Sequence, residues 1–73
     1  MNEKEMMKLD MVKNLAILLM NDEPQFSMEQ TLQTVLNSDT YQRLLRDTTA
    51  LYYQSPRYVY SFLQSELKTG SIK

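Results

Sequence analysis

Residues 39–54 read DTYQRLLRDTTALYYQ, and the spacing of the apolar side chains in this stretch decides the fold class. The members of the stripe recur at intervals of three and four residues: Tyr41, Leu44, Leu45, Thr48, Leu51 and Tyr52. Side chains at these intervals lie on one face of an α-helix. We therefore predict an amphipathic helix over residues 39–54, capped by Ser38 or Asp39. Thr48 and Thr49 lower helix propensity in its middle, but we expect the helix to continue through them.

Another helix follows directly, over residues 56–69. Ser55 is a favoured N-cap, and Pro56 is favoured at the first helical position, where its missing N–H is not needed. The apolar face of this helix consists of Val59, Phe62, Leu63 and Leu67. Gly70 suits the C-cap position, and we expect residues 71–73 to fray.

Two helices are predicted before residue 39. Ser27 and Gln30 have the spacing of a capping box, which predicts a helix over residues 28–36. An earlier helix, over residues 4–21, is indicated by apolar residues at helical spacing: Leu9, Val12, Leu15, Ala16 and Leu19. This helix ends before Pro24, because the residue that precedes a proline is displaced from the α conformation.

The short links between these segments favour helices that are neighbours in space. We therefore predict an all-α fold, a compact bundle of four helices that forms a single domain over residues 1–73, with residues 1–3 frayed as well. The alternative is a three-helix fold in which residues 28–36 form only a turn.

The composition excludes several classes of function. The chain has 73 residues, 8 Lys and Arg against 9 Asp and Glu, a net charge of −1, and no Cys or His. Disulfide scaffolds, Cys/His metal sites and catalysis by a thiol or imidazole are therefore excluded. No nucleophile stands beside a base, so we expect no enzymatic activity, cofactor, metal or small-molecule substrate. The slightly negative charge disfavours nucleic acid as a partner.

The size of the chain favours a protein partner. Its longest apolar run, residues 15–20, is far shorter than the roughly 20 residues that span a bilayer. We therefore expect no membrane partner and a cytoplasmic location. Below about 70–80 residues, a single core rarely stabilises a fold by more than roughly 3–5 kcal/mol. Since disulfides and metal cannot contribute here, we expect a protein partner or a homo-oligomer.

Six residues are candidates for contact with that partner: Ile17, Leu18, Arg46, Tyr53, Arg57 and Tyr58. Ile17 and Leu18 lie well to either side of the apolar face of the first helix, so this end of the helix is either sandwiched within the bundle or in contact with another chain. Tyr53 points away from the apolar stripe, on the side of Arg46, unless it packs under the corner that follows. Tyr and Arg are enriched in interface hot spots.

Residues 47–67, DTTALYYQSPRYVYSFLQSEL, resemble the C-terminal part of a family of short bacterial helical proteins of unknown function. The features in common are a helix rich in Tyr and Leu, a polar turn and a Tyr-Val start to the last helix, here Leu51, Tyr52, Gln54, Ser55, Tyr58 and Val59. The resemblance extends over residues 9–68, including the Ser27 cap, and departs at Tyr52 or Tyr53, where members often carry His. It implies no activity, cofactor or catalytic residue. Genes of this family often lie beside a gene for an ADP-ribosyltransferase-like protein, which implies an accessory or antitoxin-like role.

We therefore predict a small non-catalytic protein-interaction module, in its sharpest form an antitoxin-like or regulatory subunit of a bacterial protein pair. The alternative is a small helical DNA-binding transcriptional regulator, since small bundles include helix-turn-helix proteins. In that case Arg43, Arg46 and Arg57 would contact phosphate, and the five Tyr would stack on bases.

Overall fold

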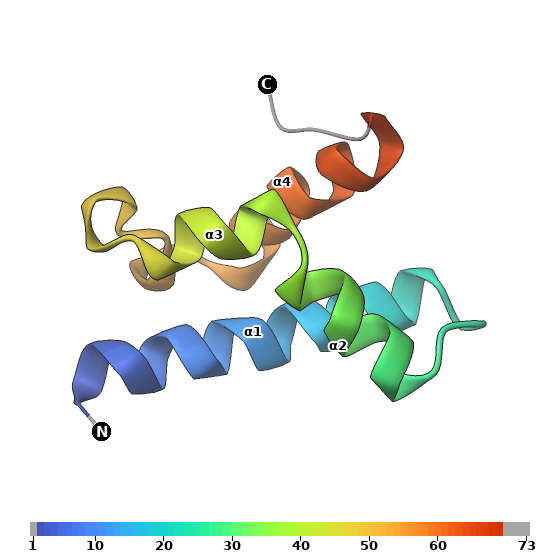
Figure 1. Ribbon diagram of the computed structural model, residues 1–73, viewed down its shortest axis with the longest axis horizontal. Helices are drawn as coiled ribbons and strands as arrows, with labels where there is room; N and C mark the ends of the chain where they lie inside the picture. Colours follow the sequence, from blue (N-terminus) through green and yellow to red (C-terminus); the bar gives the residue numbers. More distant parts are fainter. Residues whose placement is uncertain (1, 70–73) are drawn as a thin grey trace.

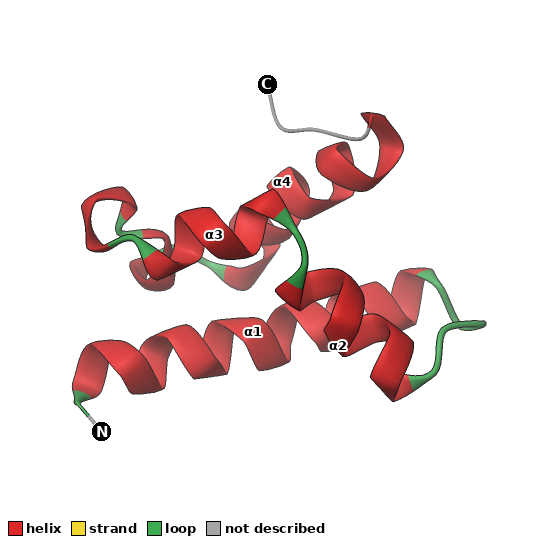
Figure 2. Ribbon diagram, in the orientation of Figure 1, coloured by secondary structure: helices red, strands yellow, loops and turns green. Residues whose placement is uncertain are grey.

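All regular elements in the computed structural model, which describes residues 2–69, are helical (Figures 1 and 2). In chain order they are α1 (Glu3–Asp22), α2 (Met28–Leu36), α3 (Asp39–Leu45), the 3₁₀ turns η1 (Asp47–Thr49) and η2 (Leu51–Tyr53), and α4 (Pro56–Thr69). Helix α1 is the longest; α2 packs on its C-terminal half, and α3 and α4 lie side by side above it in Figure 1. The predicted all-α bundle of four helices is confirmed, with α2 a true helix and not a turn.

The predicted N-caps of three helices are confirmed. The side-chain oxygen of Ser27 accepts the backbone N–H of Gln30 at 3.1 Å, and the Gln30 side chain accepts the N–H of Ser27 at 2.9 Å, which completes the capping box. Ser38 caps α3 and Ser55 caps α4, each by accepting a backbone N–H three residues later. These bonds satisfy N–H groups that have no partner inside the helix.

The first helix begins earlier than we predicted. The Oδ1 atom of Asn2 accepts the N–H of Glu5 at 2.9 Å, and α1 starts at Glu3. Asn2 and Glu3, for which we expected fraying, therefore form the N-cap and the first turn. The predicted Gly70 cap and the predicted frayed tail, residues 71–73, lie outside the described residues.

Helix α3 ends at Leu45, so the continuous helix predicted over residues 39–54 is wrong beyond that point. Side chains bind the carbonyl groups that a longer helix would use. The Thr49 hydroxyl donates to the carbonyl of Arg43 at 2.6 Å, and the Lys8 ammonium donates to that of Leu45 at 3.0 Å. Such side-chain bonds offer the backbone an alternative to the helical ladder.

Ala50 turns the chain between η1 and η2. Its backbone is left-handed, with φ 51° and ψ 27°, a conformation that brings Cβ close to a carbonyl oxygen. After this turn Leu51 and Tyr52 still reach the core, but Tyr53 is 63% exposed. The turn therefore separates a tyrosine that stabilises the fold from one that faces solvent.

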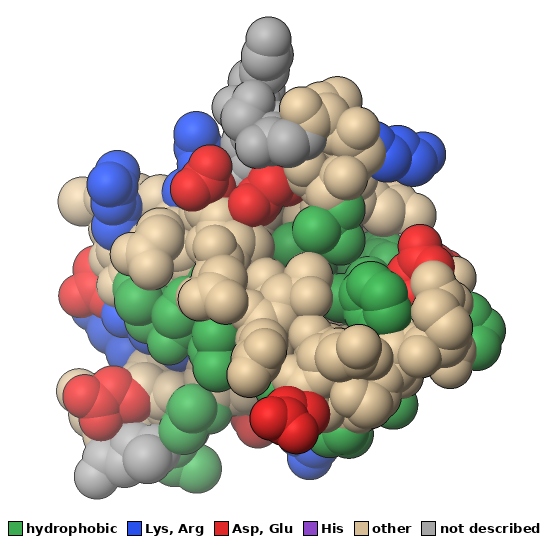
Figure 3. Space-filling view, turned by 45° about the vertical axis from the view of Figure 1, so that its right-hand side comes forward, with side chains coloured by type: hydrophobic (Ala, Val, Ile, Leu, Met, Phe, Trp, Pro, Cys, Tyr) green, Lys and Arg blue, Asp and Glu red, His purple; other side chains and the backbone are tan. Residues whose placement is uncertain are grey.

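One hydrophobic core joins all four helices and η2. Its buried members are Met11, Leu15, Leu19, Val35, Leu44, Leu51, Tyr52, Val59, Tyr60 and Leu63. Five residues that sit on the apolar faces lie at the edges of those faces and are exposed: Leu9, Met28, Leu36, Leu45 and Leu67. Short helices in so small a chain cannot cover the full width of each other's apolar stripes. Hydrophobic groups therefore reach the surface between polar ones, as Figure 3 shows for one side.

Polar contacts tie α4 to α3 and α1. The Glu66 carboxylate accepts the backbone N–H groups of Asp39 and Thr40, at 2.7 and 3.0 Å, and the Thr40 hydroxyl at 2.9 Å. The phenol of Tyr60 donates to Asp22 of α1 at 2.6 Å. Among residues 2–69, each buried side-chain nitrogen or oxygen has a hydrogen-bond partner. The buried polar groups thus add to the packing without leaving a group unsatisfied.

Candidate functional site

A groove of about 430 Å³ lies between the C-terminal half of α1 and the start of α4. It brings together Ile17, Leu18 and Arg57, three of the six candidate residues, and its other lining residues are Asn14, Ser55 and Pro56. Ser55 and Pro56 start α4 alongside α1, and this local geometry places the next residue, Arg57, at the groove. We call this feature the α1–α4 groove.

Ile17 and Leu18 occupy different environments in the α1–α4 groove. Leu18 is half-buried and packs against the core, whereas Ile17 is 47% exposed. Successive helical residues point about 100° apart, so the two side chains cannot share one environment. Of the two alternatives left open by the sequence, packing within the bundle describes Leu18. Ile17 remains accessible to a second chain.

A smaller hollow of about 200 Å³ continues the groove toward the N-terminus of α1. Its lining residues are Met7, Asp10, Met11, Asn14, Tyr52, Gln54 and Pro56. Asn14 and Pro56 line both spaces, so the two form one trough along α1. The ring of Tyr53 lies 4.7 Å from that of Tyr52, between centroids. Tyr53 thus contacts a residue that lines the hollow, and its high exposure shows that it does not pack under the corner.

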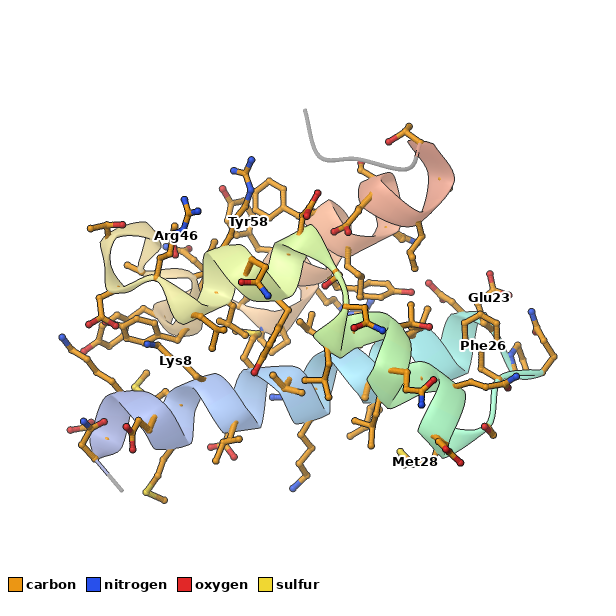
Figure 4. The ribbon with its side chains drawn as sticks, in the orientation of Figure 1. Lys8, Glu23, Phe26, Met28, Arg46 and Tyr58 are labelled. Carbon is orange, nitrogen blue, oxygen red and sulfur yellow. The ribbon has the colours of Figure 1, made fainter. Side chains whose placement is uncertain are left out.

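The remaining candidates, Arg46 and Tyr58, lie elsewhere. Both project from the α3–α4 side of the molecule, away from α1, as Figure 4 shows. Tyr58 is exposed and meets Phe62 edge-on, with ring centroids 5.1 Å apart. The six candidates therefore do not form one surface: three line the α1–α4 groove, Tyr53 contacts Tyr52 of the smaller hollow, and two face another direction.

Lys8 is a structural residue whose role the sequence did not show. Its ammonium donates to the carboxylate of Asp47 at 2.8 Å and lies 5.5 Å from the centroid of the Tyr52 ring. In Figure 4 it points from α1 toward the turn after α3. The hydrogen bond and charge of Lys8 lower the pKa of the Asp47 carboxyl. The one available signal was a lysine on the apolar face of α1, one turn before Val12.

A second polar cluster lies where α1 ends beside α4. Asp22 accepts hydrogen bonds from the phenol of Tyr60 at 2.6 Å and from the side-chain amide of Gln64 at 3.1 Å. Burial raises the pKa of Tyr60, and the hydrogen bond and charge of Asp22 raise it further. The phenol therefore stays protonated and acts as a donor that holds the two helices together. Within residues 2–69, no cluster of three potential ligand side chains could hold a metal ion.

Comparison with known proteins leaves the family open. No protein-family model matches the chain, and no curated protein sequence or solved structure matches it significantly. The resemblance to short bacterial helical proteins therefore stays a prediction. None of the described helices combines the length and the apolar character needed to cross a bilayer. The fold defines the class, an all-α bundle of four helices, and the α1–α4 groove is its candidate site.

Proposed function

We propose that this chain is a small non-catalytic module that binds another protein through the α1–α4 groove. The observation that carries the proposal is the convergence of Ile17, Leu18 and Arg57 on one open groove. The exposed Ile17 offers apolar area to a partner, and the half-buried Leu18 is held in place by the core. The guanidinium of Arg57 offers several hydrogen-bond donors. Arg is enriched in interface hot spots, and apolar side chains form the buried centre of an interface.

In its sharpest form, the proposal makes this chain an antitoxin-like or regulatory subunit of a bacterial protein pair in the cytoplasm. Its support is the accessory role that the resemblance over residues 9–68 implies. A regulatory subunit needs no chemistry of its own, only a surface held rigidly enough to lose little entropy on binding. Two lining residues of the groove are held rigidly in this way, because Leu18 packs against the core and Pro56 begins a capped helix.

The DNA-binding alternative has less support from the geometry. Helices α2 and α3 are joined by a short turn, as in a helix-turn-helix, whose second helix places its N-terminal residues against the bases. In this chain, that end of α3 carries Asp39 and the bound carboxylate of Glu66. Two negative charges there would repel the phosphate backbone. In addition, Arg46 and Arg57 lie on different sides of the bundle.

The test uses the full chain with a tag, expressed in its native host, and starts by identifying the protein that co-purifies with it. Binding of that purified protein is then measured by calorimetry for three variants. We expect Ile17→Glu and Arg57→Ala each to weaken binding about tenfold or more, as at hot-spot residues. Arg46→Ala is the matched control and should bind like the wild type. Equal binding by the wild type and Ile17→Glu, with circular dichroism unchanged, would refute the proposal.

A further inference from the structure

A second apolar surface lies on the other flank of α1. There a groove of about 250 Å³ separates the N-terminal half of α1 from α3, and its lining residues are Glu5, Lys8, Leu9, Val12, Tyr41 and Leu45. Leu9 is 55% exposed and Leu45 is 43% exposed; Met6, which lies beside Leu9 on α1, is 56% exposed. Large apolar side chains gathered in this way on two elements are typical of a contact surface. We call this feature the α1–α3 groove.

Charges beside the α1–α3 groove are arranged as a second copy of the chain would require. Glu5 and Lys13 lie four residues before and after Leu9, about 6 Å away in each direction along the helix axis. They also lie about 40° to either side of Leu9 around the helix. Both are exposed, and neither has an ion-pair partner within residues 2–69. When two α1 helices pack antiparallel about an axis beside Leu9, Glu5 of each copy meets Lys13 of the other.

We propose that two copies of this chain form a homodimer through the α1–α3 groove, with antiparallel α1 helices and the two-fold axis beside Leu9. The residues of α1 that line the groove run from Glu5 to Val12, so the groove is centred near Leu9. Leu9 of each copy therefore lies at the mouth of the other copy's groove, near Leu45. The same patch is buried on both copies, as two-fold symmetry demands.

The apolar and charged parts of this interface have different roles. Burial of Leu9, Met6 and Leu45 removes exposed apolar area from water and supplies the affinity. The two symmetric Glu5–Lys13 pairs define the register and the antiparallel orientation, since a parallel pair would place like charges together. The interface does not include the α1–α4 groove. That groove stays open in the dimer, so the two proposals can fail independently.

The first test measures the mass of the full chain by light scattering and sedimentation equilibrium over a concentration series. We expect twice the chain mass of 8.6 kDa. Leu9→Glu should abolish the dimer and leave the helical circular dichroism unchanged, because Leu9 is exposed in the single chain. Met28→Glu is the matched control, an apolar-to-acidic change at a similarly exposed position on α2, away from the N-terminal half of α1 (Figure 4), and should leave the dimer intact. A wild type that stays monomeric up to about 1 mM, where even weak interfaces associate, would overturn the proposal.

The charge pairs allow a more specific test. Lys13→Glu and Glu5→Lys each place like charges opposite each other at two symmetric positions, and each should raise the dimer dissociation constant about tenfold. The double variant Glu5→Lys/Lys13→Glu restores opposite charges and should dimerise within about threefold of the wild type. A double variant no tighter than the single ones would refute the proposed register. Dissociation by Ile17→Glu but not by Leu9→Glu would overturn the proposed surface.

Discussion

Replacing Glu66 with Ala is expected to lower the free energy of unfolding by about 2 kcal/mol, close to half of what a core of this size supplies. The carboxylate accepts three hydrogen bonds at the start of α3, two from the backbone of Asp39 and Thr40 and one from the Thr40 hydroxyl. A capping bond contributes about 0.5–2 kcal/mol, and a negative charge at a helix N-terminus about 0.3–1 kcal/mol. Thr40 is fully buried, so loss of its acceptor adds about 1 kcal/mol of desolvation cost. Because Glu66 is half-exposed, we take the lower part of the sum.

The assay is equilibrium unfolding in urea followed by far-UV circular dichroism, at one chain concentration because self-association changes apparent stability. With a denaturant slope of about 1 kcal/mol per molar, the midpoint should fall by about 2 M. Glu66→Gln keeps one acceptor oxygen without the charge and should lose about half as much. Glu29→Ala removes an exposed carboxylate from the first turn of α2 and is the matched control. Equal midpoints for Glu66→Ala and Glu29→Ala would refute the reasoning.

The remaining predictions concern the turn after α3 and the two polar contacts of α1. Ala50→Gly should raise the free energy of unfolding by about 0.5 kcal/mol. Glycine adopts the left-handed conformation without a Cβ clash, and this gain is partly offset by its greater freedom in the unfolded chain. A lower unfolding midpoint in urea would contradict this prediction. Tyr60→Phe should cost about 1 kcal/mol at neutral pH through loss of the bond to Asp22. Since the pKa of Tyr60 is raised, the folded state keeps a proton that the unfolded chain loses above about pH 10, so wild-type stability should fall there more steeply than that of Tyr60→Phe. Lys8 lowers the pKa of Asp47, so the ion pair stabilises the fold above about pH 4 and its contribution disappears as the pH falls through the lowered pKa. The difference in melting temperature between the wild type and Asp47→Asn should therefore shrink in acid, and a constant difference from pH 2 to pH 6 would contradict it.

Both proposals involve α1, and their surfaces are independent for a geometric reason. Its buried residues Met11, Leu15 and Leu19 face the core, which leaves one flank toward α3 and another toward the start of α4. A helix that contacts the rest of the bundle along one face can present both flanks to other chains. The homodimer would cover the α3 flank and leave the α4 flank for a different protein.

The starts of α2, α3 and α4 could be predicted because capping acts over short distances. Ser27, Ser38 and Ser55 each bind a backbone N–H three residues later, so the sequence pattern and the bond involve the same few residues. The end of α3 could not be predicted in this way. It depends partly on Lys8, which reaches the carbonyl of Leu45 across 37 positions of the chain.

The candidate site was predictable in its parts and unpredictable as an arrangement. The sequence showed that Ile17 and Leu18 could not both share the main face of their helix, and it identified Arg57 as a surface residue. It did not show that these three line one groove, or that Arg46 and Tyr58 lie on another side. Nor did it indicate the exposure of Leu9 and Leu45, which periodicity placed with the core residues.

The all-α class, the starts of α2, α3 and α4 and the absence of thiol and imidazole chemistry follow from the amino-acid sequence alone, because composition and contacts within one helical turn suffice for these. Packing of the helices settles that residues 28–36 form a true helix, where α3 stops, which edges of the apolar stripes remain in water, and which distant residues share a groove. These features depend on contacts between residues far apart in the chain, and such contacts exist only after the helices have packed.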